Sequence, residues 1–184
     1  MKIASTIIVL ALLVLQPSFG QSMEKTATQV PNDWKELKGD NYWLIYPEDW
    51  ELNTSGQMGS TFALLSPVSS SKDKFRENVN FMIQDLSGYN MNLEAFAKVS
   101  EEQVKTLVTD GELIESTLIV GNTLNHQKTI FTGKQGIFNL IFEQHYWVEN
   151  DKAFILSFTC EESQHEKYKE VGAKILNSFQ LFIR

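Results

Sequence analysis

The sequence contains little of the residues that mark several protein classes. Cys160 is the only cysteine among 184 residues, which excludes a disulfide-stabilised scaffold. Four prolines and ten glycines are too few for a collagen-like or low-complexity chain. Lys and Arg number 16 against 23 Asp and Glu, giving a formal charge of −7, so we expect no nucleic-acid partner.

Long hydrophobic runs are absent beyond the first 20 residues. Hydrophobic residues make up 42% of the chain and charged residues 21%, which are globular proportions that exclude disorder and a polytopic membrane protein. After Trp34, no linker rich in Pro, Gly or Ser and no internal repeat interrupts the sequence. We therefore expect residues 34–184 to form a single domain, which is large enough to bury a substantial core.

The N-terminus has the three regions of a secretory signal peptide. Lys2 is followed by an uncharged apolar stretch over 3–15, a helix-breaking proline, and small residues before a cleavage point after Gly20. The apolar stretch is shorter than the roughly 20 residues that cross a bilayer, and no cysteine follows it to accept a lipid. These features predict a signal peptide over 1–20, a flexible leader over 21–33, and no transmembrane segment. We expect a secreted or periplasmic protein that is soluble after cleavage.

Hydrophobic patterns predict three strands and a helix in the first half of the domain. Apolar or alternating runs at 42–46, 61–65 and 79–84 are typical of strands. A helix is expected to begin after the N-cap Asn92 and to end before Gly111. Its predicted buried face consists of Leu93, Phe96, Ala97, Ser100, Val104, Leu107 and Val108.

Four strand-like runs and a closing helix occupy the second half. The runs are 112–120, 123–132, 137–148 and 152–160, joined by turn-rich connections at 121–122, 133–136 and 150–151. Such short connections are typical of an antiparallel meander, because parallel neighbours need a longer crossover. Ser163 and Glu166 have the spacing of a capping box at the start of the last helix. The complete pattern predicts an α+β fold in which helices flank an antiparallel sheet.

Five short segments resemble the PsbP-like superfamily in their order and spacing. YWLIYPEDW at 42–50, an aromatic strand with Tyr-Pro and a tryptophan three residues later, is similar to the start of that family. VNF at 79–81 and LEAF at 93–96 are similar to its middle. DKAF at 151–154 and ILNSF at 175–179 are similar to its end.

The resemblance extends over 42–182 and implies an α/β/α sandwich built around an antiparallel sheet. Relatives with this fold include extrinsic subunits of photosystem II, a Ran-binding nuclear import factor and DcrB-like bacterial envelope proteins. They share docking on larger partners without known catalysis, so the resemblance implies a protein partner and neither enzyme activity nor a cofactor. DcrB-like members are often lipid-anchored, and this chain departs from them because it lacks the cysteine that carries the lipid.

Motifs of common catalytic sites are absent from the sequence. It contains no Gly-x-Ser-x-Gly, His-Glu-x-x-His or Cys-x-x-Cys motif and no glycine-rich phosphate-binding loop. Cys160 lies in an apolar strand-like run next to Glu161 and Glu162, whose charges raise the pKa of a thiol. We therefore interpret this cysteine as structural and expect no catalytic residues.

One group of side chains has the composition of a metal site. If 133–136 close a simple hairpin, His126 lies opposite Glu143, and Glu143 shares a strand face with His145. Two imidazoles and a carboxylate are suitable ligands for a divalent metal. The simpler interpretation is an ordinary cross-strand contact between histidine and carboxylate. Trp147 falls on the same face, where we expect it to be partly exposed and part of a docking surface.

Two functional hypotheses of different classes follow. The first is a secreted, non-catalytic accessory module that docks on an envelope or extracellular protein through one sheet face and its loops. The second is a small-ligand or divalent-metal-binding protein that uses the face with His126, Glu143 and His145. A deep apolar pocket with converging polar groups favours the ligand, and a flat exposed patch favours the partner. The sequence leaves the oligomeric state open.

Overall fold

The computed structural model describes residues 30–71 and 73–183. The signal peptide expected over 1–20 lies outside the described residues, and so does most of the leader expected over 21–33. None of the helices in the described ranges is long and apolar enough to cross a membrane.

Two antiparallel sheets and two α-helices make up the described part of the chain. The larger, seven-stranded sheet has the order β3-β4-β5-β9-β8-β7-β6, and the smaller has the order β1-β2-β10. The strands are β1 (Trp34–Lys38), β2 (Tyr42–Pro47), β3 (Glu51–Asn53), β4 (Ser60–Leu65), β5 (Asn78–Asp85), β6 (Thr109–Ile119), β7 (His126–Gln135), β8 (Phe138–Glu149), β9 (Lys152–Glu161) and β10 (Gln180–Leu181). The helices are α1 (Leu93–Leu107) and α2 (His165–Ser178), with 3-10 turns η1 (Gln57–Gly59) and η2 (Glu162–Gln164).

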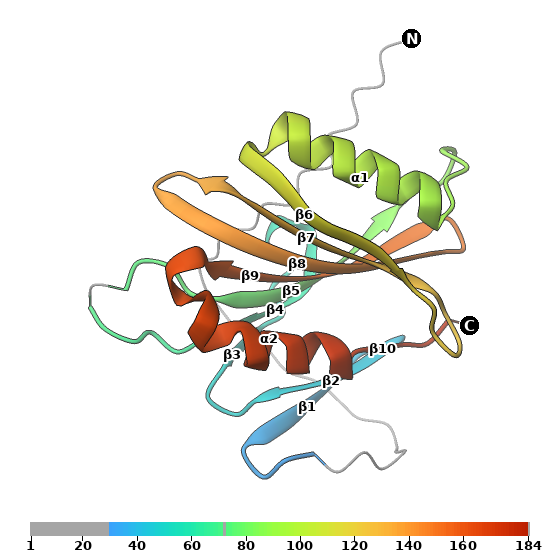
Figure 1. Cartoon of the computed structure of the whole chain (residues 1–184). Helices are drawn as coiled ribbons and strands as arrows, with labels where there is room; N and C mark the ends of the chain where they lie inside the picture. Colours follow the sequence, from blue (N-terminus) through green and yellow to red (C-terminus); the bar gives the residue numbers. More distant parts are fainter. Residues whose placement is uncertain (1–29, 72, 184) are drawn as a thin grey trace.

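The two helices lie on opposite faces of the larger sheet (Figure 1). Helix α1 packs on β6, β7 and β8, whereas α2 packs on β9 and β5 and on β2 of the smaller sheet. The protein is therefore an α+β fold with an antiparallel sheet between helices, which confirms the fold class predicted from the sequence.

Strand β9 shows why both faces of the sheet are covered. Every residue from Ala153 to Cys160 is buried, and successive side chains of a strand point to opposite faces. Leu156 and Phe158 enter the core beneath α2, while Ala153 and Ile155 enter a separate core beneath α1. A strand with apolar side chains on both faces is stable only when each face is covered, and this sequence supplies one helix for each.

The start of α1 is as predicted, and its last turn is not. The Asn92 side chain accepts a hydrogen bond of 2.9 Å from the Ala95 amide, as expected of an N-cap. Phe96 and Val104 are buried, but Leu107 is 61% exposed and lies outside the buried face. The predicted apolar stripe is therefore wrong at its C-terminal end.

Gly111 has a different role from the helix stop that we predicted. Helix α1 ends at Leu107, the C-cap Val108 is already extended, and Gly111 lies inside β6. A Cβ at this position would lie 2.1 Å from the Val104 carbonyl oxygen. Glycine is needed here because the strand passes close to the end of the helix, not because the helix ends in a left-handed residue.

The predicted capping box of α2 is wrong. Ser163 lies within η2, and the N-cap position belongs to Gln164, whose side chain makes no capping hydrogen bond. Gln164 has φ −105° and ψ −2°, so the 3-10 turn leads directly into the helix. No extended residue is left at which a serine would act as N-cap.

The β7–β8 hairpin is tighter than the loop expected over 133–136. Gln135 pairs with Phe138, so the turn consists of Gly136 and Ile137, and Gly136 has a φ of 60°. The register differs from the expected one by four residues. Because four is an even number, each side chain keeps its predicted face.

The β8–β9 hairpin agrees with the prediction. Asn150 and Asp151 form its turn with φ values of 51° and 55°. Two consecutive positive φ values are required by a type I′ turn, which asparagine and aspartate tolerate better than most residues. Leu156, Phe158 and Cys160 therefore share a face with the predicted histidine cluster on β8.

Replacing Gly172 by alanine should destabilise the protein, although alanine in a helix is normally favoured over glycine by about 1 kcal/mol. A Cβ on Gly172 of α2 would lie 2.7 Å from the Phe158 ring on β9. Overpacking of this kind costs about 1–3 kcal/mol. We expect a net loss of about 1 kcal/mol in the free energy of unfolding, measured with urea.

Adding Phe158→Leu to Gly172→Ala should recover part of this loss in stability, since the smaller leucine side chain leaves room for the new Cβ. A Gly172→Ala protein at least as stable as the wild type would show that α2 does not pack this closely on β9.

Candidate functional site

The predicted histidine cluster lies on one face of β7 and β8, the face toward α2. His126, Glu143 and His145 share this face, as expected, but His126 does not lie opposite Glu143, because Ile130 holds that position. Instead the His126 ring stacks on the His145 ring, with centroids 4.9 Å apart, and is equally close to Trp147. The three side chains are thus neighbours, with contacts other than those predicted.

The polar atoms of this cluster bind one another. His145 Nε2 and Glu143 Oε1 are 3.1 Å apart, and Lys128 Nζ lies 3.9 Å from the same oxygen. Burial acts to raise the pKa of Glu143, but the hydrogen bond and charge of His145 and the charge of Lys128 lower it overall. In the ranges that the structure describes, no group of three His, Cys, Asp or Glu is arranged to hold a metal ion. The geometry therefore favours an ordinary contact between histidine and carboxylate over the metal site, and this contact lies along β8 instead of across two strands as predicted.

Trp147 is part of the core, contrary to our expectation. It is 6% exposed, and its ring lies 5.2 Å from the ring of Phe179, which follows α2. The small sheet and the C-terminal segment thus cover the face that the sequence placed at the surface. Since α1 covers the other face at β6, β7 and β8, these strands offer no open docking face, and the edges and loops of the sheet are left for contacts.

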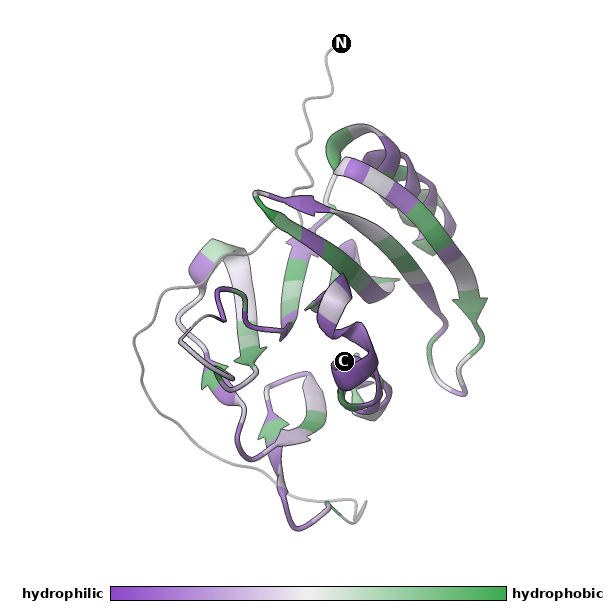
Figure 2. Cartoon of the chain, turned by 60° about the vertical axis from the view of Figure 1, so that its left-hand side comes forward, coloured by the Kyte–Doolittle hydropathy of each residue, from purple (hydrophilic) through white to green (hydrophobic). Residues whose placement is uncertain are grey.

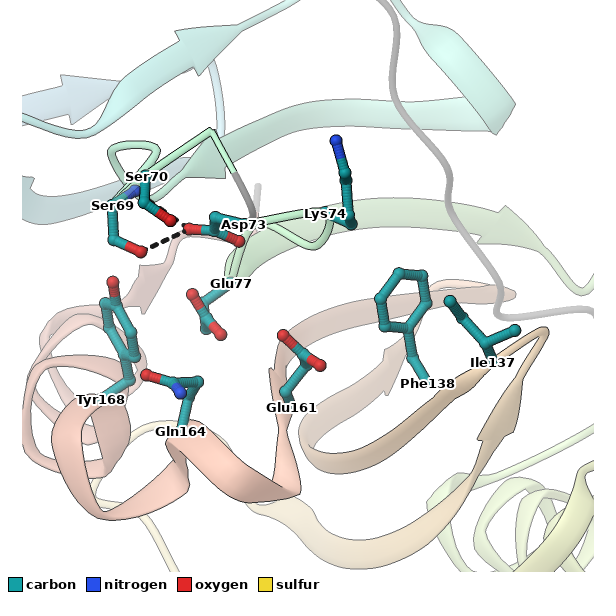
Figure 3. A pocket seen from close by; sticks show the side chains of 10 residues that line it. All are labelled: Ser69, Ser70, Asp73, Lys74, Glu77, Ile137, Phe138, Glu161, Gln164 and Tyr168. Atoms are coloured by element: carbon teal, nitrogen blue, oxygen red, sulfur yellow. Dashed lines mark hydrogen bonds between the residues drawn. The ribbon is translucent and has the colours of Figure 1, made fainter.

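A second polar site, which the sequence analysis missed, surrounds a cavity of about 330 Å³ where β9 ends and α2 begins. Its lining comes from the segment between β4 and β5, the β7–β8 turn, β9, η2 and α2. The residues are Ser69, Ser70, Asp73, Lys74, Glu77, Ile137, Phe138, Glu161, Gln164 and Tyr168. Figure 3 shows the carboxylates of Glu77 and Glu161 in the middle of these side chains.

Glu77 is the unusual residue of this cavity. It is 2% exposed, and the Ser66 hydroxyl donates to its Oε2 at 3.2 Å. Its other oxygen, Oε1, has no hydrogen-bond partner in the described part of the chain. Burial raises the pKa of Glu77, and the charges of Asp73 and Glu161 add to this effect. A buried carboxylate with an unpaired oxygen is costly, so its retention calls for an explanation.

The guanidinium next to Glu77 in sequence does not neutralise it. Arg76 donates to the Ser66 carbonyl oxygen at 2.6 Å, to the Leu65 carbonyl oxygen at 3.3 Å and to Glu51 Oε2 at 2.7 Å. These bonds tie the start of β5 to β4 and β3. The cation is thus used for structure, while the adjacent carboxylate points into the cavity.

A sequence signal for Glu77 existed. The residue is in phase with Val79 and Phe81, which form the buried face of β5. A carboxylate in the apolar register of a strand indicates a buried charge. Cys160 is its cross-strand neighbour, and burial together with the charges of Glu77 and Glu161 raises the pKa of that thiol to about 12, in agreement with a structural cysteine.

Comparison with known proteins places the fold. No protein-family model and no curated protein matches the sequence. The solution structure of cyanobacterial PsbP (CyanoP) from Synechocystis sp. PCC 6803 superposes with a TM-score of 0.59 at 10% identity, covering 86% of this chain and 98% of that one. The chain has a PsbP-like fold.

Two further structures share the PsbP-like fold. PA94 from Pseudomonas aeruginosa, a protein of unknown function, gives a TM-score of 0.57 at 11% identity and covers 83% of this chain and 99% of that one. LpqN, involved in cell envelope biogenesis of Mycobacterium tuberculosis, gives 0.57 at 10% identity, with coverages of 83% and 93%. At these identities the likeness establishes the fold and not the function. The resemblance found in the sequence is therefore confirmed as a PsbP-like fold.

The half-buried His126 should make stability depend on pH. Burial and the nearby His145 lower the pKa of His126 to about 4, against about 6.5 for an unperturbed histidine. The unfolded chain therefore takes up the proton first. The contribution of His126 to the free energy of unfolding should have its full value above about pH 6.5 and should decrease as the pH falls toward about 4. Urea unfolding at a series of pH values between these limits measures this loss.

His126→Phe keeps the ring contacts and cannot be protonated, so it should lose this part of the pH dependence. His165→Phe, at the partly exposed start of α2, should keep the wild-type dependence. Equal pH slopes for wild type and His126→Phe would contradict the half-buried, neutral state of this histidine.

Proposed function

We propose that the protein is a non-catalytic accessory module of the cell envelope or the cell exterior that binds a partner protein. The observation that carries this proposal is strand β6, a long edge strand with exposed apolar side chains, in a sheet whose two faces are covered. The partner in this proposal is an extended segment that adds to the sheet at β6.

Strand β6 has the features of an interaction edge. Among the described strands it pairs with β7 alone, so its outer side presents backbone donors and acceptors. Ile114, Leu118 and the following Val120 are 57%, 52% and 78% exposed. Figure 2 shows hydrophobic segments along this outermost strand and at its end. Edge strands are normally blunted with charges and bulges, and β6 has both as far as Glu115, with Glu112, Glu115 and two irregularities in its pairing with β7. Beyond Glu115 it carries exposed apolar residues, which mark binding surfaces.

A groove beside β6 provides room for side chains of such a segment. A cavity of about 480 Å³ lies between α1 and the end of β6, lined by the apolar Leu93, Ala97 and Leu118 and by polar residues that include Glu94 and Lys98. In strand addition, backbone hydrogen bonds supply affinity and neighbouring pockets supply specificity. The opposite edge strand, β3, has only three residues, which favours β6 as the binding edge.

Two further observations support a role in the envelope or outside the cell. The first 20 residues have the pattern of a signal peptide. LpqN, which shares the fold, is involved in cell envelope biogenesis. The alternative, a metal- or ligand-binding protein that uses His126, Glu143 and His145, is not favoured, because these side chains are occupied with one another.

The protein isolated from its own host should begin at Gln21, because the signal peptide is removed on export. Intact mass spectrometry of the purified protein measures this directly. Leu12→Arg places a charge in the apolar stretch and should block export and cleavage. Finding Met1 in the exported wild-type protein would contradict the signal-peptide interpretation.

A photo-crosslinking residue at position 118 should form a covalent adduct with a partner protein in living cells of the host. The same residue at Glu170, on the exposed side of α2, is the control and should give no such adduct. Ile114→Lys should lower the adduct yield at position 118 by about tenfold, since loss of one interface anchor of more than about 1.4 kcal/mol has this effect. Its melting temperature should stay near that of the wild type.

Equal adduct yields at positions 118 and 170, or no adduct at position 118, would contradict binding at β6.

A further inference from the structure

We propose that the cavity around Glu77 and Glu161 binds an alkylammonium cation, the group carried by a lysine side chain or by a free diamine. This site is distinct from the β6 edge, and the proposal does not depend on partner binding there.

The charges of the cavity favour a cationic ligand. Asp73, Glu77 and Glu161 line it, against the single cation Lys74. Asp73 accepts hydrogen bonds from the Ser69 amide and hydroxyl at 3.0 and 2.8 Å, so part of its bonding capacity is used locally. The two glutamates face the space at the centre of Figure 3.

The unpaired oxygen of Glu77 points to a missing donor. Glu77 is 2% exposed and lines the cavity, and its Oε1 lacks a hydrogen-bond partner among the described residues. An N⁺–H donor in the cavity would satisfy this oxygen and offset part of the negative charge of the two glutamates. Without such a donor, the buried group bears the full cost of an unpaired acceptor.

The other lining residues suit an alkylammonium group better than a metal ion or a guanidinium. No set of three His, Cys, Asp or Glu in the described ranges is placed to ligate a metal. A guanidinium binds best to two oxygens at once, whereas an ammonium is a point donor that suits a single unpaired oxygen. The Gln164 amide oxygen offers a further acceptor for its other N–H groups, and so does the Tyr168 hydroxyl, which already accepts from Lys167 Nζ at 3.0 Å.

The apolar wall of the cavity fits the methylene part of the same ligand. Ile137 and Phe138 come from the tight β7–β8 turn, and Ile137 is 88% exposed. Isoleucine is an unusual residue for a hairpin turn, where polar residues and glycine prevail. The alkyl chain of the ligand would cover Ile137 while the ammonium group at its end reaches Glu77. The methylene groups of lysine side chains cover apolar surfaces in the same way.

Proton release gives the proposal a specific signature. Burial and the charges of Asp73 and Glu161 favour the protonated form of Glu77, while its own backbone amide, the Ser66 hydroxyl and the charge of Lys167 act in the opposite direction, and the pKa is raised overall. A bound cation would shift Glu77 to its ionised form and release the proton to solvent. Binding should therefore become tighter as the pH rises, as linkage requires.

An NMR titration with cadaverine, and separately with a short peptide that contains one lysine, tests the proposal. The protein as its host produces it should show saturable shifts at the β7–β8 turn and at the start of α2. Glu77→Gln, whose amide still accepts from Ser66, should bind about tenfold more weakly or worse, because it loses a charge-assisted hydrogen bond. It should also lose the pH dependence. Glu162→Gln removes an exposed charge next to the cavity and should leave binding nearly unchanged.

The outcomes separate the sources of the ligand. Tighter binding of the peptide assigns the cation to a protein, and tighter binding of cadaverine assigns it to a free amine. Equal binding by wild type and Glu77→Gln, equal binding of the neutral 1-pentanol, saturation by Ca²⁺ or Zn²⁺ alone at this cavity, or no binding at all would overturn the proposal. If Glu77→Gln does not fold, Glu161→Gln takes its place with the same expected loss.

Discussion

The structure depends on a sheet that is apolar on both faces, and strand β9 shows this property most clearly. Eight consecutive residues from Ala153 to Cys160 are buried, so water must be excluded from either side of this strand. One face is covered by α1, and the other by α2 together with the small sheet. The close approach of Gly172 to Phe158 shows how tightly the second layer is fitted.

This constraint also limits where other molecules can bind. The helices and the small sheet leave the strand edges and the loops at the ends of the sheet open to contacts. The long edge strand β6 keeps exposed apolar residues such as Leu118. The junction between β9 and α2 holds Glu77 in a cavity with one oxygen unpaired. The histidine cluster, by contrast, lies under the second layer, where its members bind one another and stabilise the fold.

Long periodic runs made the meander and both helices predictable, because burial of one or two faces imposes their spacing. The turn at 150–151 was predictable since both residues tolerate a positive φ. Gly133 was interpreted as a turn residue, and this made the predicted β7–β8 loop too long. The glycine lies inside β7 and allows close packing, because a Cβ would lie 2.3 Å from the Val108 side chain. The resulting register error was even, so the face of His126 was right and its partners were wrong. The short strands β1, β3 and β10 carry too few residues for a pattern, and the Glu77 cavity joins five segments that only the fold brings together.

Amide hydrogen exchange of the protein, free and in the native complex from its own host, tests the central claim that the sheet recruits a partner at its open edge. If a partner adds a strand there, exchange should slow along β6 (Thr109–Ile119), whose outer amides gain acceptors. The other edge strand, β3 (Glu51–Asn53), should exchange equally in both states. Unchanged exchange along β6, with protection confined to other parts of the molecule, would contradict the account.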